Sequence, residues 1–367
     1  MLKKKFNDSS INQLFHLFKF LVVIHLILGC SHSNNIFNNE NGIIKSKSII
    51  SIDSSDLVIC NINPGCYLQT EFINDSVLML MDLCNENKKF LNLYNFSQNR
   101  PLYNSGSIGK GANEYIYRPM LARSNHNNTI MISDQNGFLK EVKIQDKEMK
   151  VINEYPLLTE AGTRELHVID DNIYGKNTNF GNGIFFIQKN YSKLNTSSLK
   201  WVGLPPSLDL TTEEQKYSQL LGDNYFHINK QKNRIISGMR YFNKVYFFDL
   251  NGELINEFKV QNDIKKKKII DESKEFISDD AIIYTNGITS TNNYIYIIFY
   301  GKTFDNMAQI DKSSSYIIQI DWDGKLKNTY HVRYRVESIS VSPDDKTLYL
   351  SIQQPENGAG KLWKTEI

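Results

Sequence analysis

Two histidines are the residues of this chain whose type and spacing could most readily do chemistry. His167 and His227 each stand near the start of a predicted strand, in neighbouring repeat units. Neutral imidazoles bind metal ions and transfer protons near neutral pH. A metal site would need further Asp, Glu or His side chains, and Thr289 and Ser340 occupy the equivalent places in other units. The pair is therefore either a shared metal or polar site or two separate histidines satisfied by backbone or water.

The sequence carries no familiar catalytic motif. It has no Gly-x-Ser-x-Gly nucleophile elbow and no His-Glu-x-x-His zinc motif. Gly109 and Gly111 flank Lys110, but a Walker loop would require Ser or Thr after the lysine and a helix beyond it. We therefore predict no catalytic residue, no cofactor and no metal, and we expect the two glycines to form a tight turn.

Short apolar runs separated by turn signals recur along the chain and predict the elements that must hold these residues. The clearest unit has strands at 225–228, 234–237, 244–249 and 254–260, with Asn-Gly at 251–252. Asn-Gly favours a hairpin because both residues tolerate positive φ. Similar units are predicted within 77–106, 129–156, 165–202 and 294–332. A spacing of about 40 to 60 residues is typical of four-stranded propeller blades.

The final unit is incomplete. Residues 337–341, 347–352 and 361–366 predict only three strands before the chain ends. The strand-like stretch 49–62 has no partner of its own, and pairing it with the last unit would cover both open edges. The sequence therefore predicts an all-β, six-bladed β-propeller, with five or seven blades as alternatives, in which an N-terminal strand completes the last blade.

Composition agrees with a folded β-protein. Hydrophobic residues make up 41% of the 367 residues and charged residues 22%, which supports a core over most of the length. The chain holds 20 Tyr and 20 Phe, and aromatic residues favour strands. A net charge of +2 gives no strong field toward nucleic acid, so we expect no nucleic-acid partner.

The N-terminus resembles a lipoprotein signal peptide. Three lysines at 3–5 precede an apolar run, densest at 20–28, that is shorter than the ~20 residues needed to span a bilayer. Ile27-Leu28-Gly29-Cys30 resembles the bacterial lipobox, in which the cysteine receives a diacylglycerol, although Leu28 is bulkier than usual. The alternatives are an uncleaved anchor and a plain secretory signal. We predict a signal peptide at 1–29, a flexible tether at 30–43 and a single β-propeller domain at 44–367.

Lipidation of Cys30 would make the membrane a partner and place the propeller in the cell envelope. Ser31 is not the Asp that retains some lipoproteins in the inner membrane, so the outer membrane is favoured, facing the periplasm or the outside. Cys60 and Cys66 flank an Asn-Pro-Gly turn and could form a disulfide that closes a small loop, in which case Cys84 would remain unpaired. The alternative is that all three thiols are unpaired.

These features together resemble the TolB-like six-bladed propeller lipoproteins of bacteria. That family carries a Gly-x-Gly-Pro-x-Glu string after the first unit, and here residues 109–114 read Gly-Lys-Gly-Ala-Asn-Glu and lead to Arg118-Pro119. The turn Ser-Pro-Asp-Asp-Lys at 342–346 is similar to one repeated in TolB-type blades. The resemblance covers about residues 45 to 367. It implies a fold and an envelope location, and it implies no catalytic residues.

Polar loops on one face of the propeller are the predicted binding surface. Arg164, Arg240 and Tyr241 are expected to line the mouth of the funnel, where Arg donors and a Tyr ring suit a glycan, a peptide or a carboxylate. Glu114 and Arg118 either belong to this rim or lock the glycine turn. The sequence thus favours a lipid-anchored binding or scaffold module for a protein, peptide or glycan. The alternative is an envelope hydrolase or lyase with a metal or polar site on the axis.

Overall fold

The structure is a computed structural model, and all residues that it describes belong to one compact unit of the chain. These residues are 49–62, 65–74, 76–82, 89–109, 111, 114–115, 119–124, 129–134, 137–145, 147–159, 163–177, 183–208, 210–260, 269–303, 305–306, 314–353 and 360–367. The predicted signal peptide and tether lie outside them. No helix in the described part of the chain is long and apolar enough to cross a membrane.

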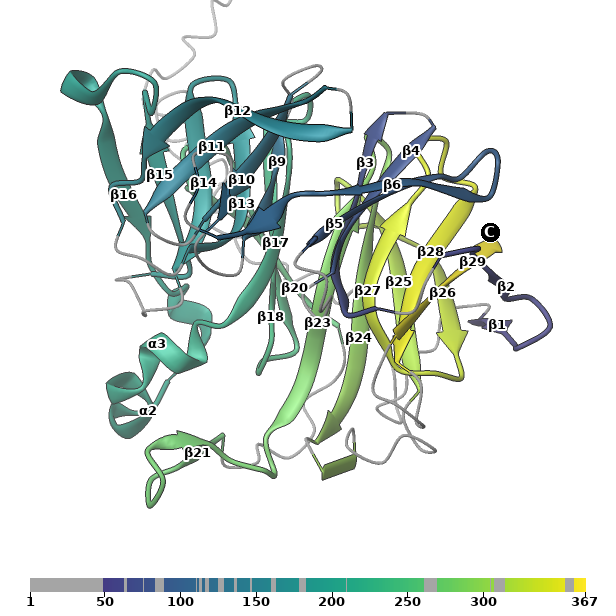
Figure 1. Cartoon of the computed structure of the whole chain (residues 1–367). Helices are drawn as coiled ribbons and strands as arrows, with labels where there is room; N and C mark the ends of the chain where they lie inside the picture. The colour runs from purple at the N-terminus through teal and green to yellow at the C-terminus, as the bar shows by residue number, and fades with distance from the viewer. Residues whose placement is uncertain are drawn as a thin grey trace, which may run out of the picture. The chain divides into compact units, whose positions relative to one another are not determined.

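The described residues form six four-stranded blades that follow one another along the chain (Figure 1). Blade 1 comprises β3 (Tyr67–Asn74), β4 (Val77–Asp82), β5 (Leu91–Asn95) and β6 (Arg100–Ser105). Blade 2 comprises β9 (Met120–Ser124), β10 (Ile130–Ser133), β11 (Phe138–Gln145) and β12 (Glu148–Pro156). Blade 3 comprises β13 (Thr163–Ile169), β14 (Asn172–Asn177), β15 (Phe185–Lys189) and β16 (Ser198–Val202). Blade 4 comprises β17 (Asn224–Asn229), β18 (Arg234–Met239), β19 (Lys244–Phe248) and β20 (Leu254–Lys259). Blade 5 comprises β23 (Ile282–Ser290), β24 (Tyr294–Thr303), β25 (Ser315–Asp321) and β26 (Leu326–Val332). Blade 6 comprises β27 (Val336–Val341), β28 (Thr347–Gln353), β29 (Gly360–Glu366) and, from the N-terminal part of the chain, β2 (Val58–Ile59).

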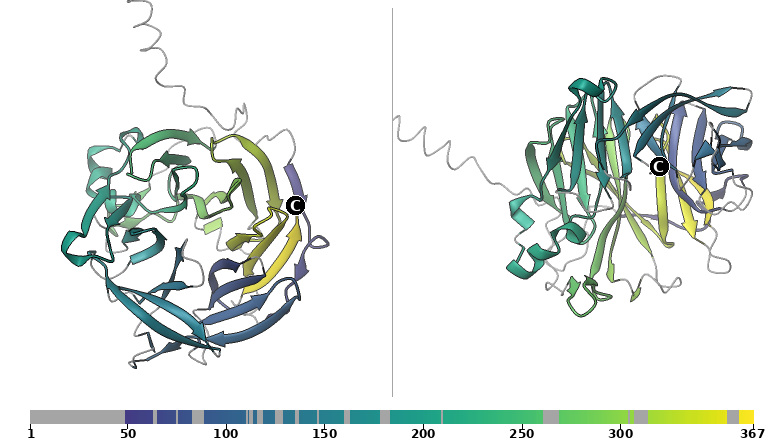
Figure 2. Two further views of the ribbon diagram at one scale, coloured as in Figure 1. Left: turned by 90° about the horizontal axis from the view of Figure 1, so that it is seen from above. Right: turned by 60° about the vertical axis from the view of Figure 1, so that its left-hand side comes forward.

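The first strands of the six blades surround a common axis. Each of β3, β9, β13, β17, β23 and β27 contacts the next, and β27 contacts β3, so the ring is closed (Figure 2). Strand β9 even pairs in parallel with β13, which joins blades 2 and 3 into one continuous sheet. The predicted six-bladed propeller is confirmed.

The N-terminal part of the domain closes the ring through β2. Val58 and Ile59 pair antiparallel with Lys364 and Trp363 of β29, as the open edge of the last blade predicted. Strand β1 (Ile49–Ile52) differs from the prediction, because it runs parallel to β26 as a fifth strand of blade 5. The stretch 49–62 therefore completes blade 6 through β2, as predicted, and also extends blade 5 through β1.

Similar glycine turns pack blade 4 against blade 3 and blade 5 against blade 4. In blades 4 and 5 an aspartate, Asp249 or Asp321, accepts backbone hydrogen bonds from the turn that follows it. The glycines of these turns, Gly252 and Gly324, have φ of 79° and 82°. A Cβ on Gly252 would lie 2.4 Å from Val202 of the preceding blade, so glycine is needed both for the conformation and for the close approach.

Short elements fill the connections between blades. Within the last hairpin of blade 3 lies η1 (Leu194–Thr196), and between blades 3 and 4 lie η2 (Pro206–Leu208), α2 (Thr212–Lys216) and α3 (Ser218–Leu221). Thr211 and Glu214 form the predicted capping box at the start of α2. Two small pairs of strands complete the description: β7 (Ser107–Ile108) with β8 (Glu114–Tyr115), and β21 (Ile270–Asp271) with β22 (Phe276–Ile277).

Neither alternative that the sequence left open for the cysteines holds, since Cys60 and Cys66 do not pair and Cys66 is not an unpaired thiol. Cys60 is a free thiol buried between the closing strand and blade 1, whereas Cys66 is disulfide-bonded. Burial raises the pKa of the Cys60 thiol to about 11. A protonated thiol is a poor nucleophile, so Cys60 acts as a small core residue.

Candidate functional site

A cavity of ≈ 630 Å³ opens on the propeller axis and is lined by the innermost strands of all six blades. Each blade supplies a polar side chain to it, namely Glu71, Arg123, His167, His227, Thr289 and Ser340. Lys230, Gln231 and Asn292 also line it. These three residues lie in or beside the hairpins between first and second strands, so the cavity lies at that end of the ring. We call it the axial cavity.

The two histidines meet inside the axial cavity. Their ring centroids lie 4.8 Å apart and the rings are nearly perpendicular. Nε2 of His167 lies 3.3 Å from the backbone oxygen of Phe226, and Nδ1 of His227 lies 2.6 Å from Oγ of Ser290. Nε2 of His227 is buried and has no hydrogen-bond partner among the described residues. Both histidines lie in the second half of their strands, not near the start as the sequence suggested, because β13 and β17 begin earlier.

Burial keeps both histidines uncharged. It lowers the pKa of His167 and of His227 well below 6.5, and the nearby Arg123 guanidinium adds to the effect on each. The proximity of the His167 ring adds a smaller lowering of the pKa of His227, because two adjacent imidazolium charges would repel each other. At neutral pH the cavity therefore presents two neutral imidazoles, each of which can donate at one nitrogen and accept at the other.

We expect the histidines to make the protein less stable in mild acid. Below about pH 6.5 the two histidines become protonated in the unfolded chain but stay neutral in the folded protein. The free energy of unfolding therefore falls by about 1.4 kcal/mol per pH unit for each histidine. Urea unfolding at pH 7 and pH 5.5 should show this loss in the wild type. The His167→Gln/His227→Gln variant keeps all carboxylates and should lose much less between the same two pH values. Equal losses in the two proteins would contradict the assignment of neutral, buried histidines.

An ion pair shares the axial cavity with the histidines. Nε of Arg123 donates to Oε2 of Glu71 over 2.6 Å and links the innermost strands of blades 1 and 2. Both side chains are mostly buried, with 20% and 28% of their surface exposed. Sequence reasoning missed both residues, because strands β3 and β9 were not predicted. No group of three or more His, Cys, Asp or Glu in the described part of the chain is placed to hold a metal ion.

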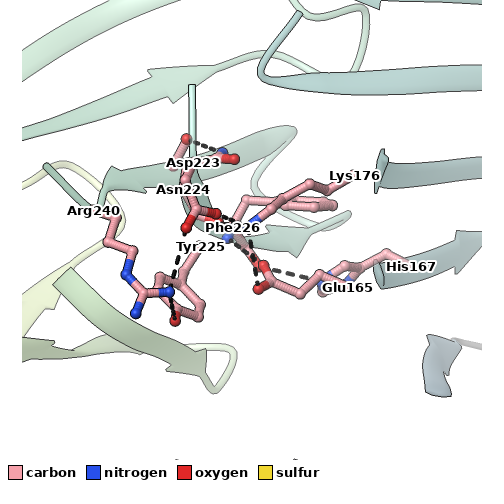
Figure 3. Close-up of polar contacts among 9 residues, drawn as sticks. Glu165, His167, Lys176, Asp223, Asn224, Tyr225, Phe226 and Arg240 are labelled. Carbon is pink, nitrogen blue, oxygen red and sulfur yellow. Dashed lines mark hydrogen bonds and ion pairs between the residues drawn. The ribbon is translucent and has the colours of Figure 1, made fainter. Parts of the chain in front are cut away.

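A second polar cluster lies at the other end of β13 and β17 and joins blades 3 and 4 (Figure 3). Nζ of Lys176 donates to Oδ1 of Asp223 over 2.5 Å and lies 3.8 Å from Oε1 of Glu165. Nη1 of Arg240 donates to Oδ2 of Asp223 over 3.3 Å and to the Tyr225 hydroxyl over 3.4 Å. We call these five residues the interblade cluster.

The interblade cluster holds its charges by mutual pairing. Burial acts to raise the pKa of Asp223, but Lys176 and Arg240 outweigh it and hold that pKa below its usual range. Burial also raises the pKa of Glu165, and Lys176 offsets this only in part. Glu165 sits at a β-bulge with φ of 49°, a conformation that costs energy for a residue with a side chain. The bulge turns its carboxylate toward Lys176 and toward the Phe226 amide, 3.3 Å away.

The structure describes the side chains of three of the five predicted rim residues, Arg240, Tyr241 and Glu114. Arg240 is engaged in the interblade cluster, and Tyr241 is only 8% exposed and packs beside the Arg240 guanidinium. The Glu114 carboxylate accepts from the Gly111 amide over 2.7 Å, so it holds the glycine turn. Arg164 pairs through its backbone with Lys176; its side chain, and all of Arg118, lie outside the described residues.

These features define a class of protein, a closed six-bladed propeller with a polar cavity on its axis. The model of one family, described as TolB-like 6-blade propeller-like, matches residues 71–344, and the chain belongs to this family. The fold supports a binding or scaffold role in general.

Two solved structures share the fold at low sequence identity. A member of the DUF4221 family from Bacteroides vulgatus is 10% identical with a TM-score of 0.57, and the match covers 86% of this chain and 99% of that one. A putative exported protein from Bacteroides fragilis is 13% identical with a TM-score of 0.51, over 87% and 100% of the two chains. No curated protein matches the sequence significantly.

Proposed function

We propose that this protein is a lipid-anchored module of the bacterial cell envelope that binds a protein, peptide or glycan partner through the axial cavity. The observation that carries the proposal is the cavity's lining, to which all six blades contribute a polar side chain. Polar groups placed by six rigid strands suit recognition, because their positions are fixed before a ligand arrives. The proposed binding face is therefore the end of the ring that holds the axial cavity, and not the opposite end, where the sequence predicted it at Arg240 and Tyr241.

Binding is favoured over an envelope hydrolase or lyase with a metal on the axis. Such a site needs three or more protein ligands, and no group of three is placed to hold a metal among the described residues. Of the described residues that line the cavity with His167 and His227, the one carboxylate, that of Glu71, is paired with Arg123. The histidines are also tied to Phe226 and Ser290 by hydrogen bonds. The polar side chains that line the cavity, including Nε2 of His227, can instead form hydrogen bonds with a ligand.

The envelope location is supported by the lipobox at residues 27–30. Its thiol at Cys30 is the acceptor for the diacylglycerol, and several buried acyl chains at ~0.8 kcal/mol per CH₂ would make anchoring effectively permanent. We expect the wild type to incorporate radioactive palmitate and to fractionate with membranes. The Cys30→Ala variant should remain an unlabelled precursor. Equal labelling of the two proteins would overturn the anchor.

Binding through the axial cavity is tested by a pull-down from the native envelope with the anchored protein. Thr289 is buried and lines the cavity, so Thr289→Trp should fill it and abolish capture of the partner. Thr212→Trp on the exposed surface of α2 serves as the matched control and should capture as well as the wild type. Capture that survives Thr289→Trp in a folded protein would rule out the axial cavity as the binding site.

A further inference from the structure

The charged groups of the axial cavity cancel one another. The Glu71 carboxylate and the Arg123 guanidinium lie 2.6 Å apart, so each neutralises the other at close range. Lys230, at the mouth, is paired with Asp170 over 2.7 Å. An anionic ligand approaching Arg123 would meet Glu71, and a cationic ligand approaching Glu71 would meet Arg123. The lining therefore offers strong hydrogen-bonding groups without a net field that selects either charge.

The uncharged groups of the cavity are donors and acceptors in close alternation. The two imidazoles are neutral, and Thr289 and Ser290 add hydroxyls that can donate or accept. The Ser290 hydroxyl keeps one bond to His227, and the Ser340 hydroxyl donates to the Thr70 backbone oxygen, so it offers a ligand only acceptor capacity. Nε2 of His227, which is buried and unpartnered among the described residues, leaves one hydrogen-bonding position to be filled. An apolar ligand would leave these buried polar groups unsatisfied, which is unfavourable.

We infer that the axial cavity binds a neutral, hydroxyl-rich ligand, an uncharged oligosaccharide of two or three sugar rings. This inference rests on the proposed function, which makes the cavity the binding site. Sugar hydroxyls donate and accept at once and so match the hydroxyls and imidazoles, while adjacent hydroxyls can bridge the Glu71 carboxylate and the Arg123 guanidinium. The volume of ≈ 630 Å³ falls in the ordinary range for sites that enclose small molecules, about 300–1,000 Å³.

The inference is tested by calorimetric titration of the folded protein with defined trisaccharides at pH 7. The neutral probes are maltotriose, cellotriose and chitotriose, and the acidic probe is trigalacturonate. We expect at least one neutral probe to bind at least about tenfold more tightly than trigalacturonate, equivalent to about 1.4 kcal/mol. Tighter binding of trigalacturonate than of every neutral probe, or no binding of any neutral probe, would overturn the inference.

Variants of the ion pair give a sharper test. Glu71→Gln leaves the Arg123 charge unopposed, so it should weaken the bound neutral sugar about tenfold and strengthen trigalacturonate by a similar factor. Glu253→Gln breaks an exposed pair with Lys200 elsewhere on the surface and should change neither affinity. Unchanged preference in a folded Glu71→Gln protein would contradict the assigned role of the pair.

The outcomes separate this inference from the proposed function. If Thr289→Trp abolishes capture of the envelope partner while no neutral trisaccharide binds, the cavity is the binding site and the ligand class is wrong. If Thr289→Trp leaves capture intact and no sugar binds, the proposed function fails as well.

Discussion

Replacing Lys176 with Met is expected to lower the free energy of unfolding by about 3–5 kcal/mol, since it removes one partner of a buried ion pair. The ammonium group donates to Asp223 and to the Asn224 backbone oxygen over 2.5 and 2.6 Å, and it faces Glu165. Without it two carboxylates remain in the interface between blades 3 and 4, and only Arg240 is left to pair with Asp223. Urea unfolding monitored by tryptophan fluorescence measures the loss.

An exposed pair of similar length provides the control. Lys230 donates to Asp170 over 2.7 Å, but the two side chains are 50% and 55% exposed. Solvent screens such pairs, which contribute less than about 1 kcal/mol. Lys230→Met should therefore have little effect on unfolding. If the two lysine variants were equally stable, the interblade cluster would not contribute to holding the blades together.

Deleting residues 45–62 is expected to cost at least about 5 kcal/mol of stability, because it removes β1, β2 and three buried side chains. Ile52, Leu57 and Cys60 are 3%, 7% and 1% exposed, and a buried apolar side chain contributes about 1.5–3 kcal/mol. The deletion also leaves β29 as an open edge. The truncated domain should unfold at lower urea concentration in a single transition that involves all blades.

Single substitutions in the same segment distinguish ring closure from a general effect of shortening. Leu57→Ala removes a core side chain and should cost about 2–5 kcal/mol, whereas Val58→Ala changes a side chain that is 52% exposed and should cost much less. A truncated protein as stable as the intact one would contradict closure by β2.

The middle strands of the blades were predictable because they are buried on both faces. Segments such as 294–300 and 316–321 read as continuous apolar runs, and Gly252 and Gly324 mark turns that only glycine can adopt against the preceding blade. The same reasoning identified an unfinished last blade and a strand to complete it. What it could not show is that β1 pairs with blade 5, since four residues carry too little pattern to select a neighbour.

Three of the innermost strands, β3, β9 and β23, were not predicted, whereas β13, β17 and β27 were. Strand β3 contains Glu71 and β9 contains Arg123; both line the axial cavity and interrupt the apolar alternation that identifies a strand. The histidines were found by their chemistry and by their place on the predicted strands 165–169 and 225–228. The interblade cluster depends on residues distant in the sequence, such as Lys176 and Asp223, which only the packed blades bring together.

Blocking the mouth of the axial cavity tests the central claim most directly. Gln231 is exposed and lines the cavity, so a Gln231→Cys variant can be coupled to a polyethylene glycol maleimide, while the buried Cys60 thiol with its raised pKa reacts slowly. Partner capture from the envelope is then compared before and after coupling. The account predicts that coupling abolishes capture without unfolding the protein; undiminished capture by the fully coupled protein would contradict it.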